Sequence, residues 1–484
     1  MNKFYLTTAI PYTNAKPHIG FALEAIQTDV IARYKRLLGN HVFFLTGTDE
    51  HGTKVYQTAR DQRSDPQRFV NNNAKAFLAL RETLNLSFDD FIRTSDKKRH
   101  WPAAQTLWLK AKTKGDIIKK NYQGLYCVGC EQFKTRKELA GGLCIIHKTR
   151  PEVVREENYF FNLFRYKKQI KEKIESNELK IIPETRKNEV LSQIEESEDF
   201  SISRNKTRLP WGIPVPNDNS QTMYVWFDAL VNYLSGVGYQ TDQKKFETFW
   251  PCDLHVIGKD VLRFHAIYWP AMLLSADLSL PKTIFVHGFL TVDGQKISKS
   301  LGNVISPEEV VKKYSIDALR YFLLSQVPPT EDGDFSWEKL HDAYNGNLAN
   351  GLGNLVSRIG ALCEKSELEF ASPKIKTSQA QLFRKNKIGK FLDDFEFNEA
   401  LRFIWGKIGE TDKKINKEKP WELLERKSGK RKVGRILQEL IDDVREIASY
   451  LGPFLPETSV SIQKQFQGPK IAQVKPLFPR FRGT

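Results

Sequence analysis

Long hydrophobic segments and cysteines are both scarce in this sequence. No apolar run approaches the ~20 residues of a membrane-spanning helix, so we expect no membrane segment and no membrane partner. The first residues, Met1–Leu6, lead directly into an apolar, threonine-rich stretch and lack the apolar core of a secretory signal peptide. Five cysteines in 484 residues indicate a reducing compartment, and we expect the cytoplasm. We find no internal repeat and no low-complexity tract, which excludes a solenoid.

Negative charge is also in deficit. The chain carries 74 lysines and arginines against 58 aspartates and glutamates, a formal net charge of +16. This excess favours a polyanionic partner, nucleic acid more than a membrane surface, although charge that serves only solubility is equally compatible with it. The hydrophobic share of 40% and the charged share of 27% are ordinary for a globular enzyme. The length predicts about three domains.

The N-terminal stretch has the pattern of an α/β nucleotide-binding fold. Phe4–Ile10 and Val42–Leu45 are short apolar runs that predict buried strands, and His18–Leu38 between them has apolar residues at helical spacing. Strand, loop, helix and strand in this order open a doubly wound parallel sheet, whose ligands bind at the carboxyl ends of the strands. His18-Ile19-Gly20 stands at a helix N-terminus, which attracts phosphate. There the histidine can hydrogen-bond a phosphate, and the glycine lets a purine approach the backbone.

A basic loop flanked by glycines lies late in the chain, within His287–Asn303. Its lysines and hydroxyls stand between two glycines: Gly294, Lys296, Ser298, Lys299, Ser300 and Gly302. Glycine at both ends permits movement, and lysine binds phosphate as a flexible point charge. We therefore interpret the loop as a mobile lid that closes on a polyphosphate. A solvated basic turn is the alternative, and the loop alone does not decide between the two.

Three of the five cysteines fall in a metal-binding pattern. Cys127-Val128-Gly129-Cys130 and Cys144-Ile145-Ile146-His147 combine three thiols and one imidazole at the spacing of a closed, tetrahedral zinc site. We predict one structural Zn²⁺ held by Cys127, Cys130, Cys144 and His147. The alternative is ordinary buried cysteine with a chance histidine. A disulfide is disfavoured in a reducing compartment.

Separated motifs carry a resemblance to a known family. Pro17-His18-Ile19-Gly20 follows the first predicted strand, Thr46–Gly52 follows the second, and Lys296–Ser300 comes late in the chain. In this order and spacing they resemble the motifs of class I aminoacyl-tRNA synthetases. Thr8–Tyr12 and Gly47–Gly52 narrow the resemblance to the methionyl-tRNA synthetases, over the whole chain. The resemblance implies that L-methionine and ATP form methionyl-adenylate and pyrophosphate, and that methionyl then passes to the 3′ end of initiator and elongator tRNA(Met).

The same resemblance divides the chain into parts. It implies a doubly wound parallel-sheet nucleotide-binding catalytic domain of the α/β class, a zinc-containing insertion, and an all-α anticodon-binding helical bundle. The expected ranges are 1–115 for the first catalytic half and 116–212 for the connective insertion, with its zinc knuckle at about 123–150. The second catalytic half is expected at 213–290, the basic loop and stem-contact region at 291–345, and the bundle at 346–484.

The resemblance also assigns roles to single residues. The expected catalytic residues are His18, Lys296 and Lys299. The expected contacts to ATP, which carries Mg²⁺, are Lys16, His18, Gly20, Gly258, Asp260, His287, Lys296, Ser298 and Lys299. The expected methionine pocket consists of Ala9, Ile10, Tyr12, Asp49, Trp226, Ala229, Tyr233, Val261 and His265. Without the resemblance, aromatic residues at helical spacing would be typical of a hydrophobic core. A thioether, however, gains from contact with aromatic rings. Asp49 can pair with the α-ammonium of methionine.

The C-terminal part has the texture of a helical bundle. Apolar stripes at helical spacing run through Leu348–Leu362 and Val433–Leu451 and predict antiparallel helices. The resemblance implies that Asn354 and Arg358 read base edges of a CAU anticodon and that Trp421 stacks on a splayed base. A helix cap and a core tryptophan are the alternative. The chain ends without an appended tRNA-binding module, so we expect a monomer.

One position departs from the family pattern. The signature is usually His-x-Gly-His, and Phe21 stands where the second histidine would face the triphosphate. Loss of one transition-state donor can cost about 10²–10³ in rate. Either a neighbour compensates, or the enzyme is slow, or the residue was altered, or Phe21 is a tolerated variant that packs on the helix face, which is the interpretation that we favour.

The rival functions are a nucleotidyltransferase of the same superfamily that uses no tRNA, and a non-catalytic tRNA-binding relative.

Overall fold

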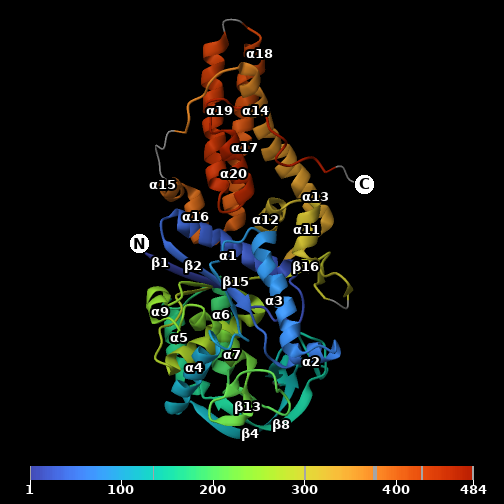
Figure 1. Ribbon diagram of the computed structural model, residues 1–484, viewed down its shortest axis with the longest axis vertical. Coiled ribbons are helices and arrows are strands. Elements are labelled where there is room, and N and C mark those ends of the chain that lie inside the picture. The colour runs from blue at the N-terminus through green and yellow to red at the C-terminus, as the bar shows by residue number, and fades with distance from the viewer. Residues whose placement is uncertain (1, 135, 299–300, 374–378, 427–428, 482–484) are drawn as a thin grey trace.

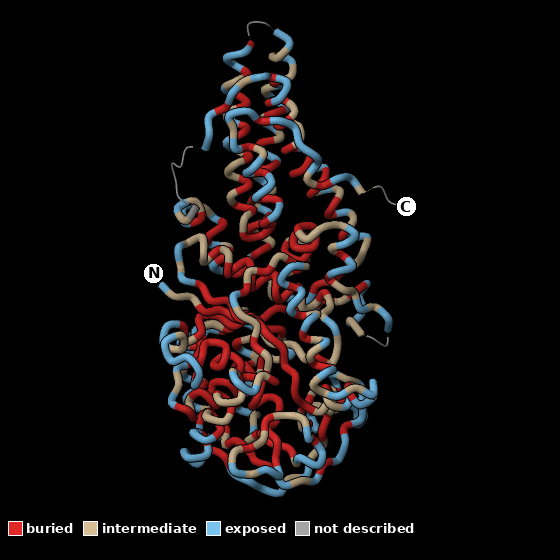
Figure 2. Tube along the Cα trace, in the orientation of Figure 1, coloured by how far each residue is buried: buried red, intermediate tan, exposed pale blue. Residues whose placement is uncertain are grey.

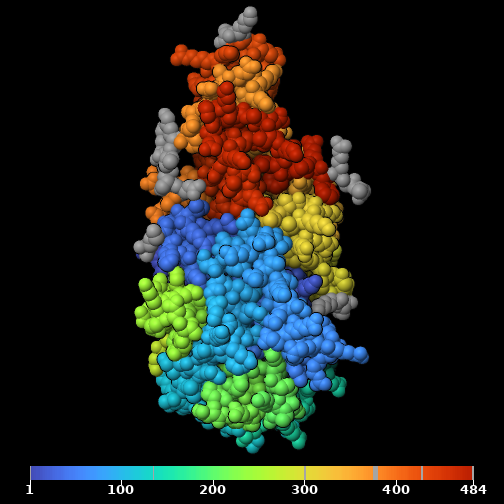
Figure 3. Space-filling view, viewed as in Figure 1, coloured from blue at the N-terminus to red at the C-terminus, as the bar shows by residue number. Residues whose placement is uncertain are grey.

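The computed structural model describes residues 2–134, 136–298, 301–373, 379–426 and 429–481. Figure 1 shows an elongated molecule with an α/β part at one end and a helical bundle that projects from it at the other. Figure 3 shows the same order on the surface, from the C-terminal bundle at one end to the chain segments coloured green at the opposite end. None of the helices in the described part of the chain is long and apolar enough to cross a bilayer.

The α/β part is organised around a parallel sheet of six strands. Its order is β3 (Asp90–Arg93), β2 (His41–Thr48), β1 (Lys3–Thr8), β14 (Leu254–Gly258), β15 (Thr283–His287) and β9 (Lys180–Ile182). All five pairings are parallel, for example Leu6 beside Phe44 on one side and beside Leu254 on the other. The strand order reverses between β1 and β14, which is where a doubly wound sheet binds its ligand. The predicted fold class is confirmed.

Both faces of the sheet are covered, as parallel strands require. Successive residues of β1 belong to different cores: Tyr5 packs with the insertion and the second catalytic half, and Leu6 packs with α1 (Ile19–Leu37) and the bundle. Figure 2 shows the buried chain concentrated in the sheet and its flanking helices and continuing along the bundle. This two-sided burial explains why the strands appear in the sequence as continuous apolar runs.

The first half contains the long helix α1, as predicted, and three further helices. These are α2 (Thr53–Asp61), α3 (Pro66–Thr83) and α4 (Trp101–Thr113). No feature of the sequence predicted β3. This strand has four residues and lies at the sheet edge, and only Ile92 in it is fully buried, so no apolar run marks it.

The chain then leaves the sheet and forms the insertion. An antiparallel sheet has the order β10 (Phe200–Ser201), β8 (Glu152–Phe161), β4 (Ile117–Cys127) and β5 (Gln132–Lys134). The other elements are η1 (Arg136–Glu138), β6 (Leu139–Ala140), β7 (Leu143–Cys144), η2 (Leu163–Tyr166), α5 (Lys167–Glu175) and α6 (Glu184–Glu196). The range 116–212 that the sequence assigned to the insertion also contains β9, which is the edge strand of the main sheet.

The second half returns to the main sheet through short elements. A three-stranded sheet consists of β11 (Ser203–Asn205), β13 (Asp218–Met223) and β12 (Pro214–Val215). The helices are α7 (Val225–Leu230), α8 (Asn232–Ser235), α9 (Gln243–Phe249), η3 (Lys259–Val261), the π-turn η4 (Phe264–Tyr268) and α10 (Trp269–Ser275). The π-turn leads directly into α10.

Between the α/β part and the bundle lies a small sheet with three helices. Its strands are β17 (Gln295–Lys296), β16 (Leu290–Val292) and β18 (Gly333–Phe335), and its helices are α11 (Pro307–Lys313), α12 (Ile316–Ser325) and α13 (Trp337–Ala343). The bundle contains η6 (Tyr344–Gly353), α14 (Asn354–Ser366), α15 (Gln379–Arg384), α16 (Lys387–Asp393), α17 (Phe397–Glu418), α18 (Pro420–Leu424), α19 (Lys430–Leu451) and α20 (Pro456–Gln465). The buried positions of α14 and α19 follow the two predicted apolar stripes.

Candidate active site

Two loops meet at the carboxyl ends of the central strands. The chain leaves β1 at Ala9, whose N–H donates to the Val256 carbonyl of β14 at 3.0 Å. It then pairs with the loop after β2, because Asp49 N–H donates to the Pro11 carbonyl at 2.9 Å and Thr13 N–H donates to the Asp49 carbonyl at 3.0 Å. These bonds bring the expected pocket residues of the first loop beside Asp49.

Aromatic rings from three elements face one another at this position. Trp226 of α7 lies edge-on to Tyr12, with ring centroids 5.9 Å apart. Phe264 of η4 stacks on the Trp226 ring with centroids 3.5 Å apart and planes 6° apart. Phe264 was not among the predicted pocket residues, although its neighbour in the sequence, His265, was. The π-turn brings Phe264 and His265 to the same site.

Hydrogen bonds determine the state of the buried His265. Its Nδ1 lies 2.9 Å from the Val261 carbonyl, which only accepts, so Nδ1 carries a proton. Burial lowers the pKa of His265 to about 4, and the ring is neutral near pH 7. Its Nε2 therefore accepts from the Tyr233 hydroxyl at 2.7 Å. This arrangement fixes one tautomer and one orientation of both side chains.

Asp49 is a buried carboxylate without a cationic partner among the described residues. In the part of the chain that the structure describes, its side chain accepts one hydrogen bond, from His51 N–H at 3.4 Å. Burial, and then the nearby Asp228, raise the pKa of Asp49 well above its ordinary value. In the same region Tyr12 Oη and Trp226 Nε1 are buried without hydrogen-bond partners in the described part of the chain. Unpaired polar groups of this kind are costly, and a bound ammonium would satisfy the carboxylate.

A buried chain of polar groups supports the Asp49 loop from behind. Asp228 of α7 lies 2.5 Å from His51 Nδ1 and 2.7 Å from His100 Nε2, and His100 Nδ1 lies 2.8 Å from Ser235 Oγ. Burial opposes the charge on Asp228, but the two histidines outweigh it and lower the Asp228 pKa. No sequence motif indicated that His100 would join this group, because the contact is long-range.

The N-terminus of α1 forms the second half of the site. His18 caps the helix, and its Nδ1 accepts from Gly20 N–H at 3.1 Å. Burial lowers the pKa of His18, so the neutral ring carries its proton on Nε2, which can donate to a ligand. A Cβ at Gly20 would lie 2.9 Å from His18 Cε1, so a side chain there would collide with the capping imidazole.

The late basic loop lies against this helix N-terminus. A Cβ at Gly20 would also lie 3.8 Å from Ile297 Cδ1, and Ile19 N–H donates to the Ile305 carbonyl at 3.0 Å. Asn303 closes the loop, since it accepts from Ser298 N–H at 2.8 Å and donates to the Lys296 carbonyl at 3.1 Å. The other predicted loop residues, Lys299 and Ser300, lie outside the described residues.

The remaining expected ATP positions line the same region. A Cβ at Gly258 would lie 2.8 Å from Asp260 Oδ1 and 3.6 Å from His287 Cε1, which places these three residues together at the ends of β14 and β15. His287 donates from Nδ1 to the Gly288 carbonyl at 2.7 Å and from Nε2 to Glu24 at 3.0 Å. Burial opposes the charge on this ring, but the Glu24 bond prevails and raises the His287 pKa. The expected contact Lys16 and the expected catalytic Lys296 are both exposed.

Phe21, the departure from the family signature, packs onto its neighbours. Its ring lies edge-on to Phe77 of α3 with centroids 5.4 Å apart, and it joins the core beneath α1. This is the packing expected of a tolerated variant on the helix face.

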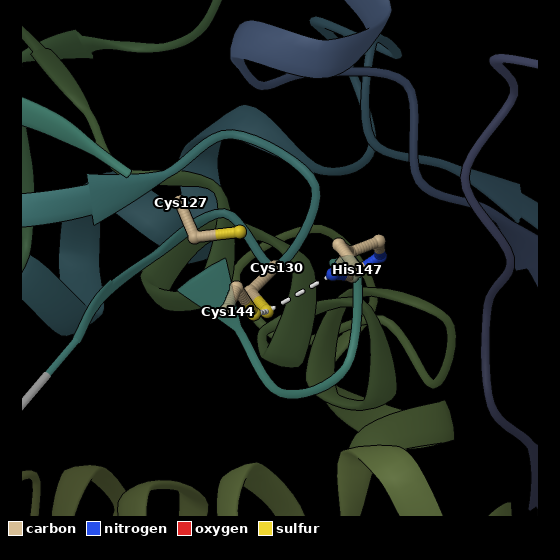
Figure 4. Close-up of side chains that lie close together, drawn as sticks. All are labelled: Cys127, Cys130, Cys144 and His147. Atoms are coloured by element: carbon tan, nitrogen blue, oxygen red, sulfur yellow. Dashed lines mark hydrogen bonds between the residues drawn. The ribbon is translucent and has the colours of Figure 1, made fainter. Parts of the chain in front are cut away.

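The four predicted metal ligands converge. Figure 4 shows Cys127, Cys130, Cys144 and His147 turned toward a common point, and their ligand atoms all lie within 4.8 Å of one another. The Cys130 and Cys144 sulfurs are 3.6 Å apart, and Cys130 Sγ is 3.2 Å from His147 Nδ1. Ligand atoms around a tetrahedral zinc lie about 3.5–3.8 Å from one another, so this donor set fits the ion. Gly129 leaves room for the imidazole, because a Cβ there would lie 2.6 Å from His147 Cγ.

The knuckle with these four ligands contacts the active site through Glu131. This buried carboxylate accepts from Lys54 N–H in the first turn of α2 and from the Tyr126 hydroxyl. The buried Arg204 stands behind them, with its guanidinium 4.9 Å from the Tyr126 ring centroid and 4.2 Å from that of Tyr224. Sequence reasoning identified neither residue, because a buried charge has no local signature.

The predicted anticodon residues form a group far from this site, in the bundle. Arg358 and the exposed Asn354 both lie on α14, and the Arg358 guanidinium is 5.8 Å from the Trp421 ring centroid. Two residues of α17 that the sequence did not indicate hold Arg358: Asp412 accepts at 2.7 Å and Asn416 at 2.7 Å. Trp421 is half-buried.

Comparisons with known proteins agree with this geometry. The profile of the family described as "tRNA synthetases class I (M)" matches residues 4–142 and 134–360. The chain is 41% identical to the methionine–tRNA ligase of Thermotoga maritima over 476 residues, which covers 95% of this chain and 74% of the relative. It is 39% identical to the enzyme of that name from Brucella suis over 519 residues, covering 99% of this chain and 98% of the relative.

Solved structures give the same result. Mycobacterium tuberculosis methionyl-tRNA synthetase in complex with methionyl-adenylate superimposes with a TM-score of 0.91 at 37% identity, covering 99% of this chain and 100% of that chain. The apo form of that enzyme gives a TM-score of 0.84 at 35% identity, covering 100% of this chain and 99% of that chain. The motifs, the two-loop site and these likenesses together show that the chain belongs to the methionine–tRNA ligase family of class I tRNA synthetases.

Proposed function

We propose that this chain joins L-methionine to tRNA(Met) in two steps. In the first, a carboxylate oxygen of methionine bonds to the α-phosphorus of ATP, and the bond to the bridging oxygen breaks, so that its electron pair leaves with pyrophosphate. In the second, a terminal ribose hydroxyl of the tRNA attacks the methionyl carbonyl, AMP leaves, and the hydroxyl proton is released. The carrying observation is that the buried Asp49, which has no cationic partner among the described residues, and its aromatic pocket share one end of the sheet with a helix N-terminus and a basic loop.

Methionine recognition is assigned to the pocket between β1, α7 and η4. Asp49 binds the α-ammonium, while Tyr12, Trp226 and the Tyr233–His265 pair surround the thioether. The positions proposed for the pocket are Ala9, Ile10, Tyr12, Asp49, Trp226, Ala229, Tyr233, Val261 and His265. The observed support is the aromatic stacking and the Tyr12 hydroxyl, a donor that has no hydrogen-bond partner among the described residues and can face sulfur.

ATP is assigned to the N-terminus of α1 and the ends of β14 and β15. The proposed contacts are Lys16, His18, Gly20, Gly258, Asp260, His287, Lys296, Ser298 and Lys299, with Mg²⁺ bound to the nucleotide. No protein nucleophile is needed, because alignment of the two substrates and positive charge on the leaving pyrophosphate supply the catalysis. His18, Lys296 and Lys299 are proposed to carry that charge and its hydrogen bonds.

One structural Zn²⁺ is assigned to Cys127, Cys130, Cys144 and His147. The ion would hold the knuckle in shape, with no open position for chemistry.

The acceptor end of the tRNA is assigned to the insertion. Its anticodon is assigned to Asn354, Arg358 and Trp421, where stacking on Trp421 contributes about 1–3 kcal/mol. The ranges 1–115, 116–212, 213–290, 291–345 and 346–484 remain our proposed domains, and a monomer in the cytoplasm remains our proposed state.

Charging of tRNA(Met) tests this function directly. Purified protein is incubated with labelled methionine, Mg²⁺-ATP and either initiator or elongator tRNA(Met), and ester-linked methionine is counted. We expect both tRNAs to be charged. Adenylate formation without charging would support a nucleotidyltransferase that uses no tRNA, and tRNA binding without adenylate formation would support a non-catalytic relative.

A further inference from the structure

A lysine at the start of α2 stands between the two halves of the site and has no assigned role. Lys54 is the second residue of α2 and lies in its first turn, after the Asp49–Gly52 loop. Its backbone is fixed, because Lys54 N–H donates to the buried Glu131 and the Lys54 carbonyl accepts from Thr58 Oγ1 at 2.7 Å. The direction of its side chain is therefore set by a well-anchored turn.

The ammonium group points back over the amino-acid pocket. Lys54 Nζ lies 5.7 Å from the ring centroid of Tyr12, the pocket residue on the loop after β1. It also interacts electrostatically with Glu131 and Cys130 of the knuckle, with Asp260 after β14 and with Lys296 of the basic loop. Its neighbours therefore belong to both the amino-acid side and the nucleotide side of the proposed site.

Within the described residues this ammonium makes no hydrogen bond and no ion pair. Other lysines that are substantially buried are satisfied: Lys134 donates to Gln132 at 2.9 Å and to Glu138 at 3.1 Å, and Lys187 donates to Asn177 at 3.0 Å. Lys54 is half-buried, so part of its hydration is lost without replacement. An anion that arrives with the substrate would give the partly desolvated Lys54 ammonium a partner.

We propose that Lys54 is a further catalytic residue whose ammonium donates hydrogen bonds to the non-bridging oxygens of the α-phosphate during adenylate formation. This inference rests on the proposed function. If Asp49 holds the methionine ammonium and the His18 side holds the nucleotide, the methionine carboxylate and the α-phosphorus meet between them, under Lys54. As the carboxylate oxygen bonds to phosphorus and pyrophosphate departs, negative charge on the α-phosphate oxygens is stabilised by the nearby cation. Lys54 keeps its proton throughout.

The test separates chemistry from methionine binding. Lys54→Met keeps the length of the aliphatic stem that lies over Tyr12 and removes the charge, and Lys54→Arg restores a charge. Lys75→Met, on the exposed face of α3, is the matched control. For each protein we would measure the kcat of methionine-dependent ATP–pyrophosphate exchange, and the Kd of methionine alone by equilibrium dialysis.

For Lys54→Met we expect the exchange kcat to fall about 10²–10³-fold, the cost of one transition-state donor, while the methionine Kd stays within twofold of wild type. Lys54→Arg should recover part of the loss, and Lys75→Met should match wild type. A Lys54→Met kcat within threefold of wild type would overturn the proposal. So would a methionine Kd that weakens by the same factor as kcat falls, because Lys54 would then only shape the Tyr12 pocket. Absence of exchange by the wild-type protein would instead refute the proposed function.

Discussion

Replacement of Asp49 by asparagine should abolish tight methionine binding and at the same time stabilise the free protein. In the free protein Asp49 is a buried carboxylate whose one side-chain hydrogen bond among the described residues is the long contact to His51 N–H. The proposed ligand supplies the missing cation. The same carboxylate therefore costs stability before binding and contributes affinity after it, and Asp49→Asn removes both effects with almost no change in volume.

The magnitude for binding follows from breaking a buried ion pair. Removal of one partner of such a pair costs about 3–5 kcal/mol. At about 1.4 kcal/mol per tenfold change, the methionine Kd should rise by roughly 10²-fold or more. The stability effect has the opposite sign, and a gain of about 1–3 kcal/mol matches the cost of an unsatisfied buried polar group.

The pH dependence gives an internal check. Burial raises the pKa of Asp49 in the folded state above its value in the unfolded chain. The contribution of Asp49 to the free energy of unfolding is therefore most favourable below the unfolded pKa, and this contribution is lost as pH rises through the folded pKa. The stability advantage of Asp49→Asn should therefore grow from acidic toward neutral pH. Methionine affinity of the wild type should fall on acidification, because the protonated carboxyl cannot pair with the ammonium.

Equilibrium dialysis with labelled methionine and urea unfolding between pH 5 and 8 would measure these quantities, with Asp61→Asn at the exposed end of α2 as the matched control. A methionine Kd for Asp49→Asn within twofold of wild type would refute the assignment of Asp49 to the ammonium. An unfolding free energy lowered by the substitution would refute the reasoning that the carboxylate is unpaired in the free protein.

Four further outcomes follow from the geometry. Phe21→His should raise the adenylation rate in single-turnover assays if a phosphate contact is missing, and an unchanged or lower rate would refute the idea that such a contact is missing. Lys299→Ala should lower ATP–pyrophosphate exchange far more than methionine affinity, whereas equal losses would assign the lysine to ground-state binding. Chelation should lower the melting temperature, and metal analysis of fresh protein should find close to one zinc per chain; less than half an equivalent would contradict the site. Arg320→Met should destabilise the chain by about 3 kcal/mol in urea unfolding, because the fully buried Arg320 bonds Asp29 at 2.8 Å and the Phe454 carbonyl at 2.7 Å; a loss below about 0.5 kcal/mol, the range of surface changes, would contradict this.

The sequence predicted the fold through signals that are local. Strands buried on both faces appear as short apolar runs, and α1 appears as a long periodic segment because it is covered on the sheet side and by α12. The edge strand β3 has no such signal, and β9 lies far in sequence from its partner β15. Strand order at sheet edges depends on tertiary contacts, which periodicity does not record.

The site was predictable to the extent that its residues fall in motifs. The four metal ligands converge because their spacing already places them on two knuckles. The partners that tune the site were missed: Phe264 reaches Trp226 only through a π-turn, and Glu131 reaches Lys54 only because the knuckle packs on α2. Asp412, which holds Arg358 between α14 and α17, is another such partner. Their roles arise from packing between distant segments and have no pattern in the sequence.

The most direct test of the central claim is ATP–pyrophosphate exchange by the purified chain with each of the standard amino acids in turn. In the proposed function, a thioether amino acid bound through Asp49 is aligned with a nucleotide bound at the N-terminus of α1 and the basic loop. We expect rapid exchange with methionine and exchange with the other amino acids that is weaker by orders of magnitude. Exchange that does not depend on methionine, or none with any amino acid, would contradict the proposed function.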